Sequence, residues 1–237
     1  MQSIASYYSL GKAGRPNEDR YRLLGGGFVL PDNRETAFKT SNRGEIYAVM
    51  DGVGGASKGM AAAQYIADKL AVFYTDTNIP STMAGIESIL SQANATIYSW
   101  GLMDGTQRPC GASTATLLWV NPDKQVYICH VGDSAAFLLT ASGLVKATTN
   151  HEDARGIYRY VGQGEGFEPE IRRYPLGDGD TWCLVTDGIT KGLKTHEIQS
   201  ILEEYAGEPD LAAKKLVESA KRKGVQDDIT AVVVEFE

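Results

Sequence analysis

The sequence is poor in cysteine, has no long apolar run and begins without a targeting signal. Its three cysteines, Cys110, Cys129 and Cys183, show no CxxC spacing and lie in or beside apolar segments. That placement predicts buried thiols in a reducing compartment. No apolar run approaches the roughly 20 residues that span a bilayer. The first ten residues lack a basic stretch followed by an apolar core. These absences predict a cytoplasmic protein without a membrane partner.

Positive charge is also scarce. The chain has 23 Lys and Arg against 30 Asp and Glu, which gives a formal net charge of -7. That balance argues against binding to nucleic acid or to an anionic membrane. Internal repeats and linker-like segments are lacking as well. The chain has 237 residues, of which 43% are apolar, so it is expected to form one domain over residues 1–237. A monomer is the default expectation for a short acidic chain.

The apolar residues that are present follow two periods. Alternating or continuous apolar runs predict strands, and the 3.6-residue period predicts helices. Strands are expected at 46–50, 113–120, 125–131, 135–139, 181–186 and 229–236. Helices are expected at 58–74, 82–100, 195–205 and 210–223. Because the helices come in pairs and the strands in hairpin-like runs, the predicted fold class is α+β, with a sheet core and paired helices outside.

Aspartates stand at the ends of these expected strands. Asp51 and Asp187 each follow a buried strand and precede a glycine. Asp133 follows the strand at 125–131, and Asp227 comes just before the last strand. Any one of them is accounted for as a turn residue. As a set they indicate a shared site, since buried strands rarely need an acidic exit each time.

Clustered carboxylates repel one another unless a cation neutralises them. Mg2+ and Mn2+ prefer oxygen ligands, and a carboxylate that bridges two such ions about 3.5–4 Å apart helps to activate water against a phosphate ester. Glycine beside Asp51 lets the backbone carbonyl of Gly52 approach an ion as well. Glu18 and Asp19, in a polar loop, are expected to orient metal-bound water.

Other phosphate-handling and metal-binding motifs do not fit. No GK[ST] follows the glycines after Asp51, which excludes a P-loop. None of the cysteines has an arginine six positions on, as a cysteine phosphatase needs. The three histidines lack metal-binding spacing. His130 lies within an expected strand and is interpreted as a satisfied core or edge residue.

Six short motifs occur in order along nearly the whole chain. They are Arg15-Pro16-Asn17-Glu18-Asp19, Asp51-Gly52-Val53-Gly54-Gly55, Gly111-Ala112-Ser113-Thr114-Ala115, Gly132-Asp133-Ser134, Thr186-Asp187-Gly188 and Asp227-Asp228-Ile229-Thr230. A single Asp-Gly is weakly informative, but six ordered motifs are specific. The set resembles the metal-dependent Ser/Thr protein phosphatases (PPM, type 2C), especially the compact bacterial ones.

The resemblance implies a β-sandwich of two antiparallel sheets flanked by helix pairs, with two Mn2+ or Mg2+ ions in a cleft at one end. By this likeness Asp51 bridges both ions and the Gly52 carbonyl joins one of them. Asp187 and Asp227 complete the ligands of the other ion. A weaker third ion, held by Asp133 with Asp187 as in the bacterial branch, is left open.

The same resemblance assigns residues to the substrate and the reaction. It implies that Arg15 holds the substrate phosphate and that Glu18 and Asp19 act through water. A metal-bridged water then hydrolyses phosphoserine or phosphothreonine, in a phosphoric monoester hydrolase that acts in signalling and opposes a bacterial Ser/Thr kinase. Because Arg15 lies three residues before Glu18, one fewer than is usual in the family, it stays open whether Lys12 or Arg20 shares the phosphate with it.

The flap that precedes the Asp187 strand is predicted to be reduced, because only residues 150–166 are available for it. Since the flap shapes substrate choice in this family, the natural substrate stays open. One alternative function is a partner-switching phosphatase of the same fold that acts on one phosphoserine protein. A catalytically inactive binding module is another, and the presence of Asp51, Asp187 and Asp227 argues against it.

Overall fold

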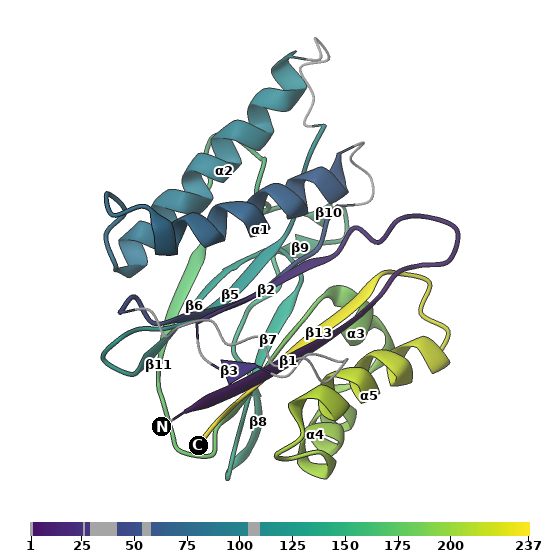
Figure 1. Ribbon diagram of the computed structural model, residues 1–237. Helices are drawn as coiled ribbons and strands as arrows, with labels where there is room; N and C mark the ends of the chain where they lie inside the picture. The colour runs from purple at the N-terminus through teal and green to yellow at the C-terminus, as the bar shows by residue number, and fades with distance from the viewer. Residues whose placement is uncertain (1, 26, 29–41, 54–57, 104–109) are drawn as a thin grey trace.

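The structure is a computed structural model that describes residues 2–25, 27–28, 42–53, 58–103 and 110–237. Over these residues two sheets pack face to face, and helices cover their outer faces (Figure 1). This arrangement confirms the predicted sandwich with helices outside. In the described part of the chain, no helix is long and apolar enough to cross a membrane. Gly54 and Gly55, which belong to one of the six motifs, lie outside the described residues.

The first sheet, sheet A, has six strands in the order β3-β1-β13-β12-β7-β8. Their bounds are Gly27–Phe28, Ser3–Leu10, Ile229–Phe236, Thr181–Val185, Ala135–Thr140 and Gly143–Lys146. Neighbours are antiparallel, except for a two-residue parallel contact between β1 and β3. Strands β1 and β13 pair from Ser3–Phe236 to Leu10–Ile229, so the two ends of the chain lie side by side (Figure 1).

The second sheet, sheet B, has five antiparallel strands in the order β11-β6-β5-β4-β2. Their bounds are Glu170–Pro175, Gln125–Val131, Ala115–Val120, Glu45–Met50 and Arg20–Leu24. A separate hairpin of two-residue strands, β9 (Glu152–Asp153) and β10 (Gly156–Ile157), lies within the segment expected to form the flap. The flap is therefore small, as predicted from its length.

Helices pack in two groups on the outer faces of the sandwich. Helices α1 (Gly59–Thr75) and α2 (Met83–Met103) cover sheet B through an apolar stripe that includes Ile66 and Leu70. Helices α4 (Thr195–Glu204) and α5 (Pro209–Arg222) cover sheet A together with the short α3 (Asp187–Gly192). The sequence pattern predicts both pairs, but it does not predict α3, which is only six residues long.

A third apolar core fills the space between the sheets, where Tyr47 and Trp182 are completely buried. Close packing in all three apolar cores restricts movement of the strands, so the positions of the strand ends are fixed. Strand β4 ends at Met50, β12 ends at Val185 and β13 begins at Ile229. The residues that follow or precede these points are the aspartates of the predicted site.

Candidate metal centre

The strand ends meet around a cavity of about 380 Å3. It is lined by Arg15, Asp51, Gly52, Val53, Asp133, Glu152, Gly156, Ile157, Asp187, Lys191 and Asp227. Six of the eight predicted site residues are in that set, and the remaining two are Glu18 and Asp19. Glu18 lines a neighbouring cavity of about 200 Å3 that shares Arg15 with the first. The structure thus brings together residues that are up to 212 positions apart, from Arg15 to Asp227.

Asp51 is held at the edge of the cavity by the two motifs around Thr114 and Ser134. The Asp51 N–H donates to the Thr114 hydroxyl at 2.9 Å, and the Asp51 carbonyl accepts the Thr114 N–H at 2.8 Å. The Thr114 hydroxyl lies 2.7 Å from that of Ser134. These bonds leave the Asp51 carboxylate to face the cavity. The third and fourth motifs therefore have a structural role in positioning the second.

Both Asp-Gly pairs need their glycine because the backbone is closely approached there. A Cβ atom on Gly52 would lie 2.5 Å from the backbone carbon of Gly59, at the start of α1. A Cβ atom on Gly188 would lie 2.2 Å from the carbonyl oxygen of Asp228. Distances this short are not tolerated by any larger residue without backbone movement. The second contact draws the start of α3 against the start of β13, and with it Asp187 toward Asp227.

Asp19 does not line the cavity but is buried close to it, with 3% of its surface exposed. Its Oδ2 atom accepts hydrogen bonds from the hydroxyl groups of Thr186, at 2.9 Å, and Thr230, at 2.7 Å. Burial raises the pKa of Asp19 to about 7, although the two threonine bonds act in the opposite direction. Asp19 thus ties the end of sheet B to the residues that flank Asp187 and Asp227.

The loop that contains Arg15 is fixed by Asp228. The Asp228 carboxylate accepts the backbone N–H groups of Lys12, at 2.6 Å, and Glu18, at 2.9 Å. The Arg15 guanidinium lies 3.3 Å from carboxylate oxygens of both Asp227 and Asp228 and is also bonded to Glu18. This arrangement holds the arginine at the rim of the cavity.

Arg15 is the one of the three candidate phosphate-binding cations that lines the cavity. Arg20 points elsewhere, because its guanidinium donates to Gln64 at 2.6 Å and to the carbonyl of Asn17 at 2.9 Å. Lys12 contributes its backbone N–H to the loop. The shifted spacing of Arg15 therefore does not keep its side chain out of the cavity.

The carboxylates in the cavity and next to it repel one another when they are ionised, and this repulsion affects their pKa values. Burial raises the pKa of Asp51 well above its ordinary value, and the charges of four further aspartates raise it more: Asp19, Asp187, Asp133 and Asp227. Burial likewise raises the pKa of Asp133 to about 7 and raises that of Asp187. Burial acts to raise the pKa of Asp227, but Lys191, the Asp228 N–H and Arg15 together lower it below its ordinary value.

Three carboxylate oxygens of this group are buried and have no hydrogen-bond partner among the described residues. They belong to Asp19, Asp133 and Asp187. A buried oxygen without a donor is costly, and a cation is the partner that carboxylates accept best. The donor set is all oxygen, which is the set that Mg2+ and Mn2+ prefer. The residues present therefore fit a centre for hard divalent ions.

Two charged residues of the cavity, Lys191 and Glu152, are not predicted from the sequence. Lys191 lies one helical turn after Asp187 on α3, and its ammonium contacts Asp187 at 2.5 Å and Asp227 at 2.7 Å. Glu152 comes from the flap hairpin. No apolar pattern surrounds either residue. The four-residue spacing from Asp187 to Lys191 is the one signal that the sequence offers, and it requires α3 to be recognised as a helix first.

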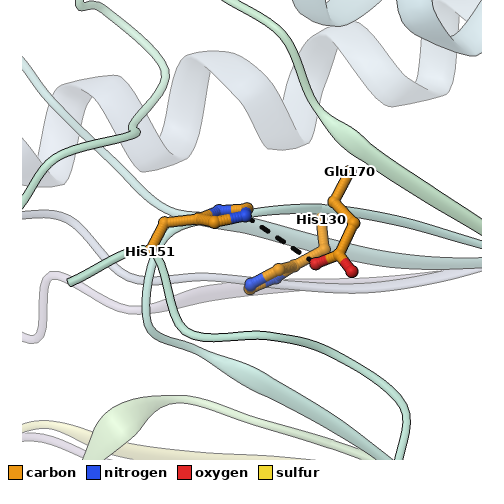
Figure 2. Close-up of side chains that lie close together, drawn as sticks. All are labelled: His130, His151 and Glu170. Atoms are coloured by element: carbon orange, nitrogen blue, oxygen red, sulfur yellow. Dashed lines mark ion pairs between the residues drawn. The ribbon is translucent and has the colours of Figure 1, made fainter.

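A second cluster of potential metal ligands lies in sheet B and beside it. His130, His151 and Glu170 bring one ligand atom each to within 4.8 Å of one another (Figure 2). The two imidazole rings are stacked with their centroids 4.9 Å apart and an angle of 25° between their planes. Both histidines are buried.

Hydrogen bonding shows that this cluster is structural. His130 donates from Nε2 to the Thr149 carbonyl at 3.0 Å, and its Nδ1 accepts from the Thr116 hydroxyl at 2.8 Å. The Nδ1 of His151 accepts the Gly132 N–H at 3.2 Å. Each ring has thus used the lone pair that a metal would need, and nearly parallel stacked rings do not direct two lone pairs at one ion. His130 is a satisfied core residue, as its place in a strand indicates.

Replacing His151 with leucine is expected to lower the free energy of unfolding by about 1–3 kcal/mol, because the buried Gly132 N–H loses its acceptor. Asparagine places an acceptor oxygen near the position of Nδ1, so His151→Asn should retain most of the stability. Urea unfolding of both variants beside the wild type measures the difference. Equal losses in the two variants would mean that ring packing, and not this hydrogen bond, supports the Gly132-Asp133 turn.

Comparison with known proteins adds an independent line of observation. Residues 45–237 match the family model described as Stage II sporulation protein E (SpoIIE). Among curated relatives, a probable protein phosphatase 2C from Arabidopsis thaliana is 26% identical and covers 88% of this chain, which spans 68% of that protein. The serine/threonine phosphatase stp of Listeria monocytogenes is also 26% identical, with 84% and 87% of the two chains covered.

Solved structures agree on the fold. PppA of Pseudomonas aeruginosa superposes with a TM-score of 0.81 at 24% identity and covers 100% of this chain and 99% of its own. The catalytic domain of the phosphatase PstP, reported in complex with two manganese ions, superposes with a TM-score of 0.80 at 22% identity, over 99% and 98% of the two chains. The full PstP of Mycobacterium tuberculosis is longer, and this chain spans only 43% of it.

The match to the family model extends over well more than half of the chain. Five of the six motifs contribute a residue to one cavity, and the third motif positions Asp51 through Thr114. The protein therefore belongs to the SpoIIE family and, as its motifs predicted, to the PPM or type 2C phosphatases.

Proposed function

We propose that this chain is a metal-dependent phosphatase that removes phosphate from phosphoserine and phosphothreonine in proteins. The observation that best supports the proposal is the cavity in which Asp51, Asp133, Asp187 and Asp227 converge beside Arg15. Curated relatives named as serine/threonine phosphatases support the same activity. Phosphorylated proteins are then the substrates, and a Ser/Thr kinase is the functional counterpart.

Two Mn2+ or Mg2+ ions are proposed to bind between Asp51 and the Gly52 carbonyl on one side and Asp187 and Asp227 on the other. When bound, the ions supply an activated water and neutralise charge on the phosphate oxygens. A third ion at Asp133 belongs to the same proposal. The buried carboxylate oxygens that have no hydrogen-bond partner among the described residues support this assignment.

Residues of the chain are proposed to bind the phosphate and to position the metal ligands. Arg15 is proposed to hold the phosphate from the rim of the cavity, with its guanidinium oriented by Glu18 and Asp228. Asp19 keeps the strand ends in register through Thr186 and Thr230. The small flap hairpin brings Gly156 and Ile157 to the cavity. Cytoplasmic location, a monomeric state and a single domain over residues 1–237 are part of the proposal.

Hydrolysis of p-nitrophenyl phosphate and of a phosphothreonine peptide tests the proposal. Both reactions are expected to require Mn2+ or Mg2+, to stop on addition of EDTA and to recover when metal is restored. Protein that is folded by circular dichroism, binds Mn2+ and yet hydrolyses neither substrate would contradict the activity. In that case the chain is a binding module that has kept the fold.

A further inference from the structure

Lys191 places a positive charge among the carboxylates of the cavity. It lies four residues after Asp187 on α3, so both side chains project from the same face of the helix. Its ammonium nitrogen is 2.5 Å from Oδ2 of Asp187 and 2.7 Å from Oδ2 of Asp227. These are the two aspartates that the proposed function assigns to one metal ion.

The other cation of the cavity does not have this position. Arg15 contacts the opposite oxygen of Asp227, at 3.3 Å, and divides its remaining contacts between Glu18 and Asp228. Among the ion pairs of the described residues, Lys191 alone joins Asp187 to Asp227. In the part of the chain that the structure describes, its ion pairs do not include Asp51.

We propose that Lys191 is a built-in cation that competes with a divalent ion for Asp187 and Asp227. The inference rests on the proposed function, because that function gives these two carboxylates to a metal. The ammonium occupies one carboxylate oxygen of each aspartate, and its charge repels a divalent ion that approaches the remaining oxygens. Entry of the ion is therefore opposed while the ammonium stays in place and is favoured when the lysine moves away.

The geometry allows that displacement. The Lys191 side chain is 53% exposed, so its flexible stem can turn the ammonium group into solvent. In the metal-free protein the same ammonium partly neutralises Asp187, whose Oδ1 atom has no hydrogen-bond partner in the described part of the chain. Lys191 thus stabilises the empty site and weakens binding of one ion. The ion that the Gly52 carbonyl joins is affected less, since the ion pairs of Lys191 are with Asp187 and Asp227.

Titration of Mn2+ into metal-free protein, followed by isothermal calorimetry without substrate, tests the inference. Lys191→Met removes the charge and keeps the length of the side chain, and it is expected to tighten the weaker class of sites by about tenfold. Lys191→Arg keeps the charge and should leave that class weak. Lys214→Met, at an exposed position on α5, changes the net charge equally and controls for long-range effects. It should bind Mn2+ as the wild type does.

Thermal unfolding gives a second readout that does not depend on catalysis. Without metal, Lys191→Met is expected to melt below the wild type, because Asp187 and Asp227 lose their shared counter-ion. With saturating Mn2+ this difference should disappear or reverse. Unchanged Mn2+ affinity in Lys191→Met, or equal tightening in Lys214→Met, would overturn the inference and leave the proposed function standing. Wild-type protein that binds no Mn2+ would overturn both.

Discussion

Replacing Asp51 with asparagine is expected to lower Mn2+-dependent hydrolysis of a phosphothreonine peptide by about a thousandfold. The amide has almost the same shape as the carboxylate, but it has no charge and is a poor bridging ligand for a hard ion. Asp51 is also the residue whose charge interacts with those of four surrounding aspartates. Measurement of kcat and KM at saturating Mn2+ distinguishes weaker metal binding from a slower hydrolysis step.

A matched control for this variant is available on the same sandwich. Asp180 is buried, directly precedes β12 and accepts the Gly177 N–H at 2.8 Å, but it does not line the cavity. Asp180→Asn is expected to retain activity within about threefold, since a neutral acceptor remains for that hydrogen bond. Asp51→Asn should stay folded and melt higher than the wild type without metal, because one repelling charge is gone. Retention of more than a tenth of wild-type activity in Asp51→Asn would contradict the proposed role.

Mn2+ is expected to stabilise the protein much more at pH 8 than at pH 5. In the metal-free fold Asp19 and Asp133 have pKa values of about 7, against an ordinary value of 3.8. As the pH rises from about 4 to 7, the unfolded chain therefore loses these protons before the folded chain does. Each group then costs the metal-free fold about 1.4 kcal/mol per pH unit, and this loss is complete near pH 7.

A bound cation reverses this cost, because it makes the ionised carboxylates favourable in the fold. With Mn2+ at a hundred times its dissociation constant, stabilisation is about 2.7 kcal/mol, or roughly 5–10 °C in Tm for a chain of this size. Calorimetry in EDTA and in Mn2+, with KCl at matched ionic strength as the control, measures the shift. A shift of the same size at pH 5 and pH 8 would show that the buried carboxylates are not the metal ligands.

The strands that the sequence predicts are those whose residues are mostly buried inside the sandwich. Strands β4 and β13 are continuous apolar runs with every residue buried, so composition alone marks them. Strand β1 is only half buried, and β11 alternates exposed and partly buried residues with two arginines. Neither stands out as apolar, although both pair along their whole length. Their strand conformation depends on neighbours that are distant in sequence, which local patterns do not reveal.

The same distinction applies to the cavity. Asp51 and Asp187 are predictable because each follows a buried strand and precedes a glycine. Glu152 and Lys191 reach the cavity from a flap hairpin and a six-residue helix, whose positions follow from tertiary packing. The pairing of Asp19 with Thr186 and Thr230 spans 167 and 211 residues and has no local signature. The sequence therefore indicates the proposed ligands, and the structure adds the neighbouring groups that affect their charge.

The central position of β13 has a consequence for how the protein is made. This strand is the last of the described elements to leave the ribosome, and it lies between β1 and β12. Until it emerges, those two earlier strands lack their shared neighbour and expose unpaired edges to other nascent chains. Asp227 is also delivered by this late segment. A chain that stops before β13 is thus both prone to aggregate and unable to assemble the proposed site, so order and activity are expected to arise together once β13 has been made.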